Sequence, residues 1–199
     1  MLPNKPHRHF ILHKPYGYLS QFIYEGKRKN SKKLLGELFD FPMGTMAIGR
    51  LDEDSEGLLL LTTDGKVSFQ ICSNKIEKEY YVQVDGIITE AEIQELQNGV
   101  EIGFDGKKYI TKPCKAALIE EPSHLQFEER HIRDERHGPK SWLSIIVIEG
   151  KFRQVRKMTA AVGFPTLRLL RVRIGNIYLE IPTGKVVEVD FLTDPKFQL

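Results

Sequence analysis

The sequence has little of what disulfide-bonded, membrane-bound or metal-dependent proteins require. Its 199 residues include only two cysteines, Cys72 and Cys114, and neither has metal-ligand spacing. The longest purely apolar run is Leu58–Leu61, far short of the roughly 20 residues that a membrane helix needs. The polar segment Met1–His9 precedes no apolar stretch of signal-peptide length. We therefore expect a cytoplasmic protein with no membrane segment, whose two thiols are reduced and buried.

Neither sign of charge is in large excess, because the formal net charge is only +2. The charged residues are nevertheless unevenly distributed along the chain. From Lys151 to Arg173 the chain carries seven Lys or Arg and no Asp or Glu, so the remaining residues sum to −5. A second acid-free basic cluster spans residues 27–33. Segregated charge can form a positive face on a nearly neutral protein, as phosphate binding requires. Chance clustering of surface charges is the alternative, and it is more plausible for residues 27–33.

Short apolar stretches separated by turn residues predict more strands than helices. We expect strands at 10–12, 58–61, 80–84, 142–148, 167–174, 177–179 and 186–191, and helices at 31–41, 66–73, 89–98 and 154–162. Residues 120–140 lack periodicity and predict a long exposed loop. Strands and helices do not alternate regularly, so the pattern favours an α+β fold with a mixed, mostly antiparallel sheet and flanking helices. No linker or repeat divides residues 1–199, which predicts a single domain.

The stretch between Gly49 and Gly57 is the first candidate for chemistry, because loops at the ends of rigid strands often carry catalytic groups. It combines one arginine with four acids, namely Arg50, Asp52, Glu53, Asp54 and Glu56. One carboxylate could act as a nucleophile or general acid, and two could form a glycosidase-like pair. Several could bind a divalent cation, and a solvated acidic turn is equally compatible with the residues alone.

Residues Gly49–Thr62, GRLDEDSEGLLLLT, closely resemble the signature of the RsuA-type ribosomal RNA pseudouridine synthases. Three further segments resemble motifs of that family in the expected order: Lys14-Pro15-Tyr16-Gly17, Lys78-Glu79-Tyr80 and Glu149–Met158. The first match is specific, whereas the two shortest motifs would be weak alone. The resemblance covers about residues 8–195. It implies the pseudouridine synthase catalytic fold, with two subdomains and the active site in the cleft between them.

The resemblance also implies roles for single residues. Asp52 matches the family's nucleophile, which acts while uracil is detached from ribose and rejoined through carbon. Arg156 matches the arginine that pairs with this carboxylate, and Tyr80 matches the tyrosine that stacks on the flipped base and assists proton removal. A phosphate contact for Arg156 and a plain core position for Tyr80 are the competing interpretations. Since the reaction is an isomerisation, we expect no metal and no cofactor.

Basic residues are expected to hold the phosphates around the extruded uridine. They are Lys14, Arg50, Lys151, Arg153, Lys157, Arg168 and Arg171, with Arg173 as a further member. Side chains alternate along a strand, so only about half of the arginines at 167–174 can face the RNA. None of the six histidines has zinc-binding spacing with the cysteines, and an RNA contact is conceivable for His13.

The position of the first motif, at residue 14, leaves no room for the N-terminal S4-type RNA-binding module of many relatives, so we expect none. Residues 163–171 are most similar to one branch that lacks this module, which predicts one uridine of large-subunit (23S) ribosomal RNA as the target. We separately expect a monomer. Alternatives are a synthase for small-subunit ribosomal RNA or transfer RNA, a non-catalytic RNA-binding protein, and a carbohydrate hydrolase. The intact Asp52, Tyr80 and Arg156 disfavour the second alternative, and the basic 151–173 segment disfavours the third.

Overall fold

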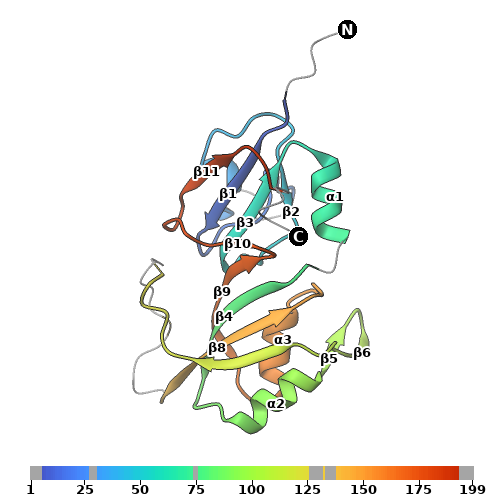
Figure 1. Cartoon of the computed structure of the whole chain (residues 1–199), viewed down its shortest axis with the longest axis vertical. Helices are drawn as coiled ribbons and strands as arrows, with labels where there is room; N and C mark the ends of the chain where they lie inside the picture. The colour runs from blue at the N-terminus through green and yellow to red at the C-terminus, as the bar shows by residue number, and fades with distance from the viewer. Residues whose placement is uncertain (1–5, 27–30, 74–75, 126–131, 133–137, 193–199) are drawn as a thin grey trace. The chain divides into compact units, whose positions relative to one another are not determined.

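The protein is described by a computed structural model that covers residues 6–26, 31–73, 76–125, 132 and 138–192. Two compact units are present: a first unit of Met1–Asn74 with Gly175–Leu199, and a second unit of Lys75–Ile174. Strands predominate in both, with helices beside them (Figure 1). The predicted α+β class with a mostly antiparallel sheet is therefore confirmed. Parts of the basic cluster at 27–33 and of the loop at 120–140 lie outside the described residues.

The first unit is built on an antiparallel sheet in which β1 lies between β11 and β3, and β2 also pairs with β3. Its elements are β1 (His9–Lys14), η2 (Leu35–Glu37), β2 (Met46–Ile48), β3 (Glu56–Thr62), α1 (Gly65–Ser73), β10 (Ile177–Tyr178) and β11 (Val186–Val189). All seven residues of β3 are buried. A strand covered on both faces needs no apolar–polar alternation, which explains the continuous run Leu58–Leu61.

The helix predicted at 31–41 is wrong. A 3-10 turn forms at Leu35–Glu37 in place of an α-helix, and Leu34 before it is extended with ψ 159°. The apolar residues pack as a bent segment on β1 instead of forming one helical stripe. Leu35 is fully buried, and the rings of Phe39 and Phe41 lie 5.8 Å and 5.3 Å from that of Phe10.

The second unit contains an antiparallel sheet in the order β9, β4, β8, β7, and a separate hairpin of β5 and β6. Its elements are β4 (Lys78–Asp85), α2 (Glu90–Asn98), β5 (Glu101–Phe104), β6 (Lys107–Ile110), β7 (Lys115–Ile119), β8 (Lys140–Val147), α3 (Gln154–Ala161) and β9 (Thr166–Ile174). Helices α2 and α3 cover one face of this sheet, as their shared core shows. The core includes Val82, Val84, Ile93, Leu96, Leu143, Ile145, Val155, Met158 and Leu169.

Helix α2, predicted at 89–98, begins at a capping box. The Thr89 side chain accepts a hydrogen bond from the Ala91 amide, and Glu92 accepts one from the Thr89 amide. Gly99 ends the helix with φ 96° and ψ 139°, a conformation outside the left-handed helical region. A Cβ at this position would meet the Thr111 carbonyl oxygen, so the close approach of two backbones requires glycine.

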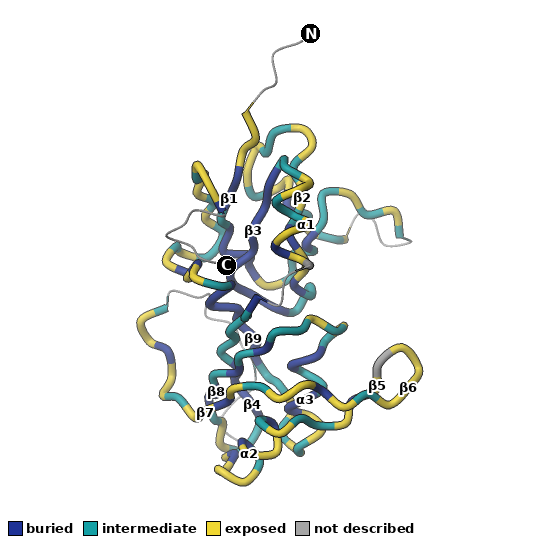
Figure 2. Tube along the Cα trace, turned by 45° about the vertical axis from the view of Figure 1, so that its right-hand side comes forward, coloured by how far each residue is buried: buried dark blue, intermediate teal, exposed yellow. Residues whose placement is uncertain are grey.

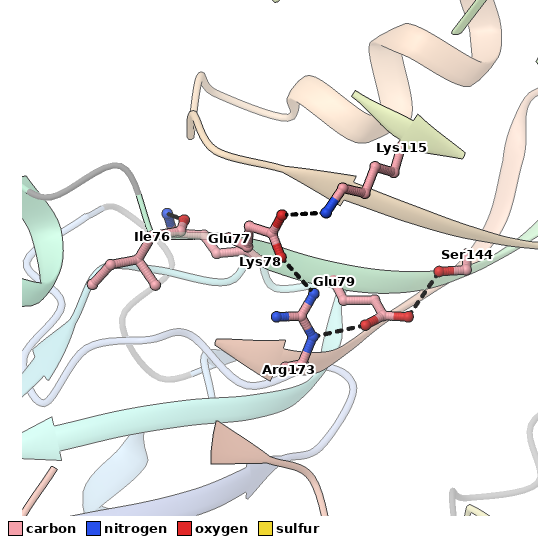
Figure 3. Close-up of polar contacts among 7 residues, drawn as sticks. All are labelled: Ile76, Glu77, Lys78, Glu79, Lys115, Ser144 and Arg173. Carbon is pink, nitrogen blue, oxygen red and sulfur yellow. Dashed lines mark hydrogen bonds and ion pairs between the residues drawn. The ribbon is translucent and has the colours of Figure 1, made fainter. Parts of the chain in front are cut away.

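An ion-pair network ties β4 and the preceding residue Glu77 to β9, β8 and β7 (Figure 3). Arg173 Nε donates to Glu79 at 2.8 Å, and its Nη2 donates to Glu77 at 3.0 Å. Ser144 Oγ donates to the other oxygen of Glu79 at 2.8 Å. Lys115 Nζ donates to Glu77 at 2.7 Å. The side chain of Arg173 is only 10% exposed whereas that of Lys115 is 72% exposed, so the arginine bond is the one shielded from water.

Replacing Arg173, which is shielded from water, should destabilise the second unit more than replacing the exposed Lys115. We expect Arg173→Gln to lower the free energy of unfolding by about 2 kcal/mol, because Glu79 would keep a largely buried carboxylate that has lost its cation. Lys115→Gln, the matched control, should cost less than about 1 kcal/mol. Urea denaturation measures both. Equal losses of unfolding free energy in the two variants would contradict the view that the arginine bonds matter more.

The same experiment has a pH dependence. Bonds from Lys115 and Arg173 hold the pKa of Glu77 below its ordinary value of 4.5. Stability from this carboxylate is therefore fully present above pH 4.5 and is lost as the pH falls through the lowered folded-state pKa. The difference between wild type and Arg173→Gln should accordingly shrink in acid.

Candidate active site

Asp52 lies in a tight turn directly before the buried strand β3. The Ser55 amide donates to the Asp52 carbonyl at 3.1 Å and closes the turn. The Gly17 amide donates to the Glu53 carbonyl at 2.8 Å, so the turn is also tied to the segment that follows β1. Asp52 itself is partly buried. Hydrogen bonds at two backbone positions therefore hold the carboxylate loop in place.

Ser20 anchors the residue that precedes the candidate nucleophile. Its Oγ donates to the Leu51 carbonyl at 2.8 Å and accepts from the Leu51 amide at 3.0 Å. Both residues are buried, so these bonds are shielded from water. The Leu51 carbonyl belongs to the peptide bond that leads into Asp52. Sequence reasoning missed Ser20, because a contact between residues 31 positions apart leaves no local signal.

The predicted RNA contact of Lys14 is wrong, because this residue is buried. Its side chain has no exposed surface, and its Nζ donates to the carbonyls of Pro15 at 2.9 Å and Tyr18 at 2.6 Å. Burial lowers the pKa of Lys14 to about 8, while the nearby carboxylates, Glu56 foremost, act to raise it. Lys14 is thus an internal cation close to the acidic loop. His13 is also buried, and its Nδ1 lies 2.9 Å from the Ile181 carbonyl oxygen. The RNA contact considered for His13 is therefore wrong as well.

Tyr80 lies on the helix-covered face of the second unit's sheet. It stands opposite Ile145 of β8 and Arg171 of β9, and it packs against the core shared with α3. The next residue, Tyr81, points to the other face, where its ring is 6.3 Å from that of His124. The alternation expected for the two tyrosines is therefore observed. A β-bulge next to Tyr80 in the pairing with β9 sets its register.

Arg156 belongs to α3, on the same side of the sheet as Tyr80. It is partly buried, and its Nη1 lies 3.5 Å from the carbonyl oxygen of Thr166, the first residue of β9. Tyr80 and Arg156 thus come from neighbouring elements of the second unit, whereas Asp52 belongs to the first.

The arginines of strand β9 are buried, so they are not accessible to phosphates as predicted. Arg168 and Arg171 are each 3% exposed, and they stand opposite Gln83 and Tyr80, on opposite faces of the sheet. Arg173 is engaged by Glu77 and Glu79, as described above. Strand alternation could not reveal this outcome, because the structure covers both faces of β9.

The other predicted basic contacts have accessible side chains. Arg50 is exposed beside the acidic loop. Lys151, Arg153 and Lys157 are partly buried and surround the start of α3. Arg153 is the N-cap residue of that helix and adopts a left-handed conformation with φ 53° and ψ 34°, which is rare for a residue with a side chain.

The possible metal ligands and the two thiols can also be located in the described part of the chain. Within those ranges, no group of three or more His, Cys, Asp or Glu side chains could hold a metal ion. Cys72 is exposed, contrary to the expectation for both thiols, and Cys114 is partly buried with Sγ 3.1 Å from the Leu96 carbonyl oxygen. Among the described helices, none is long and apolar enough to cross a membrane.

Comparison with known proteins supports the resemblance found in the sequence. A statistical description of the RNA pseudouridylate synthase family matches residues 8–161. Ribosomal large subunit pseudouridine synthase E of Xanthomonas axonopodis pv. citri is 41% identical over 172 residues, covering 85% of this chain and 87% of that protein. The protein of the same name from Vibrio vulnificus is 43% identical over 176 residues, covering 85% and 69%. A solved pseudouridylate synthase superimposes with a TM-score of 0.72 at 26% identity, over 94% of this chain and 72% of that one.

The chain therefore belongs to the RNA pseudouridylate synthase family, whose members are isomerases. Within that family it is similar to the ribosomal large subunit pseudouridine synthases E, the branch that residues 163–171 indicate. The family's catalytic fold, predicted from four short motifs, is confirmed.

Loss of the Ser20 hydroxyl should impair the reaction, although Ser20 is 31 positions from Leu51 in the sequence. We expect Ser20→Ala to lower the free energy of unfolding by about 1–3 kcal/mol, because the buried Leu51 amide and carbonyl lose their partner. The turnover of pseudouridine formation should fall about ten- to a hundredfold, because the peptide that leads into Asp52 is released. Thr45→Ala, which removes a hydroxyl bond to Pro42 in the same unit, should leave turnover unchanged. Full turnover in Ser20→Ala would contradict the positioning role.

Proposed function

We propose that the protein converts a specific uridine of large-subunit (23S) ribosomal RNA to pseudouridine, with Asp52 as the nucleophile and without a cofactor. The observation that carries the proposal is the placement of Asp52. It lies within the segment Gly49–Thr62, and hydrogen bonds from Ser55 and through Ser20 hold its backbone at the start of a buried strand. A carboxylate held in this way needs little reorganisation to act.

The reaction requires the bond between ribose C1′ and uracil N1 to break and a bond between C1′ and C5 to form. The proton on C5 is lost and N1 gains one, so neither oxidant nor metal is consumed. Asp52 acts as an ionised carboxylate on the extruded nucleotide, and the guanidinium of Arg156 pairs with it. The ring of Tyr80 stacks on the flipped uracil, and its hydroxyl assists removal of the C5 proton.

The names of similar proteins favour large-subunit RNA over the alternative targets. Both relatives at 41% and 43% identity are described as ribosomal large subunit synthases. Small-subunit ribosomal RNA and transfer RNA remain the substrates against which this choice is tested. The enzyme is proposed to act as a monomer.

Tritium release from uracil C5 tests both the nucleophile and the target. With unmodified 23S RNA labelled at C5, wild type should release tritium, and Asp52→Asn should be slower by a factor on the order of 10⁴. Asp54→Asn is the matched control, since it removes a carboxylate from the same turn, and it should stay within about tenfold of wild type. Equal losses in both variants would refute the role of Asp52. Release only from small-subunit or transfer RNA would refute the target.

Binding of the RNA should weaken steeply with salt, because phosphate contacts release counterions. We expect Lys151→Gln and Arg153→Gln each to reduce the slope of log K against log[salt] by about 1. Lys115→Gln, which removes an exposed lysine on β7, should leave the slope unchanged. Filter binding over a range of ionic strengths measures the slopes. A slope near zero for wild type would instead favour the alternative of a carbohydrate hydrolase, whose sugar substrate carries no phosphate.

A further inference from the structure

Phe152 is an exposed aromatic residue in the middle of the basic segment. It is 67% exposed, it stands between Lys151 and Arg153, and the Nζ of Lys157 lies 5.3 Å from its ring centroid. Single exposed apolar residues are common on protein surfaces, so exposure by itself assigns no role. The neighbours distinguish this ring, because aromatic faces between cations are typical of sites for single-stranded nucleic acid.

The turn that carries Phe152 is closed by two hydrogen bonds. The Gln154 amide donates to the Lys151 carbonyl at 3.1 Å, and the Lys151 amide donates to the side-chain oxygen of Gln154 at 3.0 Å. Phe152 and Arg153 are therefore the two central residues of a tight turn. The left-handed conformation of Arg153 is strained, and such strain persists only where surrounding contacts hold it.

Glu149 supplies the contacts that hold this turn. Its carboxylate accepts hydrogen bonds from the Gln154 side chain at 2.6 Å, the Tyr109 hydroxyl at 2.7 Å and the Lys112 amide at 3.0 Å. Tyr109 is part of the β5–β6 hairpin, whose own turn is exposed (Figure 2). The turn around Phe152 is consequently fastened to a second element as well as to its own helix.

The two lysines beside the ring are also held at the hairpin. Lys151 Nζ lies 5.0 Å from the centroid of the Tyr109 ring, and Lys157 Nζ donates to the Gly103 carbonyl at 2.8 Å. Cations in these positions lie beside an exposed ring and remain partly accessible. The arrangement is ordered before any ligand binds, which lowers the entropic cost of binding.

We propose that Phe152 is a stacking platform for an unpaired base of the RNA, other than the target uridine, and that Lys151, Arg153 and Lys157 bind the phosphates beside that base. The inference rests on the proposed function only for the identity of the RNA. Tyr80 is assigned to the target uracil, packs against the core and is partly buried, whereas Phe152 is exposed and suits a base at the surface. Every base has a flat face, so this contact adds affinity without strict sequence choice.

The test separates the ring from its charged neighbours. Phe152→Leu keeps an apolar side chain but removes the aromatic face, and Phe152→Trp enlarges that face. Affinity is measured with a short single-stranded RNA and with the same backbone carrying abasic sites. Phe69→Leu is the matched control, because Phe69 is 72% exposed on α1 of the first unit.

We expect Phe152→Leu to weaken binding of the single-stranded RNA between about five- and a hundredfold, with an unchanged salt slope. Wild type and Phe152→Leu should bind the abasic strand equally, and Phe69→Leu should match wild type on both strands. With labelled 23S RNA the same loss should appear in KM and not in kcat. Equal weakening on the abasic strand, or no weakening on either, would overturn the proposal.

Fluorescence gives an independent readout that a purely structural role would not produce. The chain's one tryptophan, Trp142, is 6% exposed, so a signal change beyond that of wild type comes from residue 152. Emission from Phe152→Trp should be quenched by the single-stranded RNA and not by the abasic strand. Absence of this difference overturns the proposal even if Phe152→Leu fails to fold. A wild type that binds RNA without releasing tritium would refute the proposed function and leave the stacking result intact.

Discussion

The buried ammonium group of Lys14 is the constraint on which the acidic loop of the first unit depends. Four carboxylates within residues 52–56 repel one another, and a compact turn needs a cation nearby. Lys14 lies close enough for all four to raise its pKa, which burial nevertheless lowers to about 8, so the group stays mostly charged at neutral pH. Its bonds to Pro15 and Tyr18 also set the path of the chain that brings the Gly17 amide to the acidic loop.

The candidate residues of the second unit are held by different contacts. Tyr80 is positioned by strand alternation and by the core that α3 shares with the sheet, so apolar packing fixes its side. The turn before α3 is instead held by one acceptor, Glu149, which gathers donors from Gln154, Tyr109 and the Lys112 backbone. In each unit, contacts inside that unit thus hold its candidate residues.

Sequence patterns predicted the parts of the fold that depend on local periodicity or capping, such as β3, β4 and α2. The motif resemblance supplied Asp52, Tyr80 and Arg156, whose roles stay predictions. Long-range contacts were out of reach, as Ser20 shows. The failed helix at 31–41 had an apolar stripe, but tertiary packing on Phe10 used those side chains differently. The β5–β6 hairpin did carry a usable signal, because Asp105-Gly106, both with positive φ, is a typical hairpin turn.

Burial also changes how the basic segment is understood. Seven positive charges between residues 151 and 173 suggest a strongly electrostatic RNA surface. Two of them, Arg168 and Arg171, are almost fully buried, and Arg173 is neutralised by glutamates, so the accessible charge is concentrated around the start of α3. Under the proposal made for Phe152, base stacking and phosphate binding therefore act at the same place on the second unit.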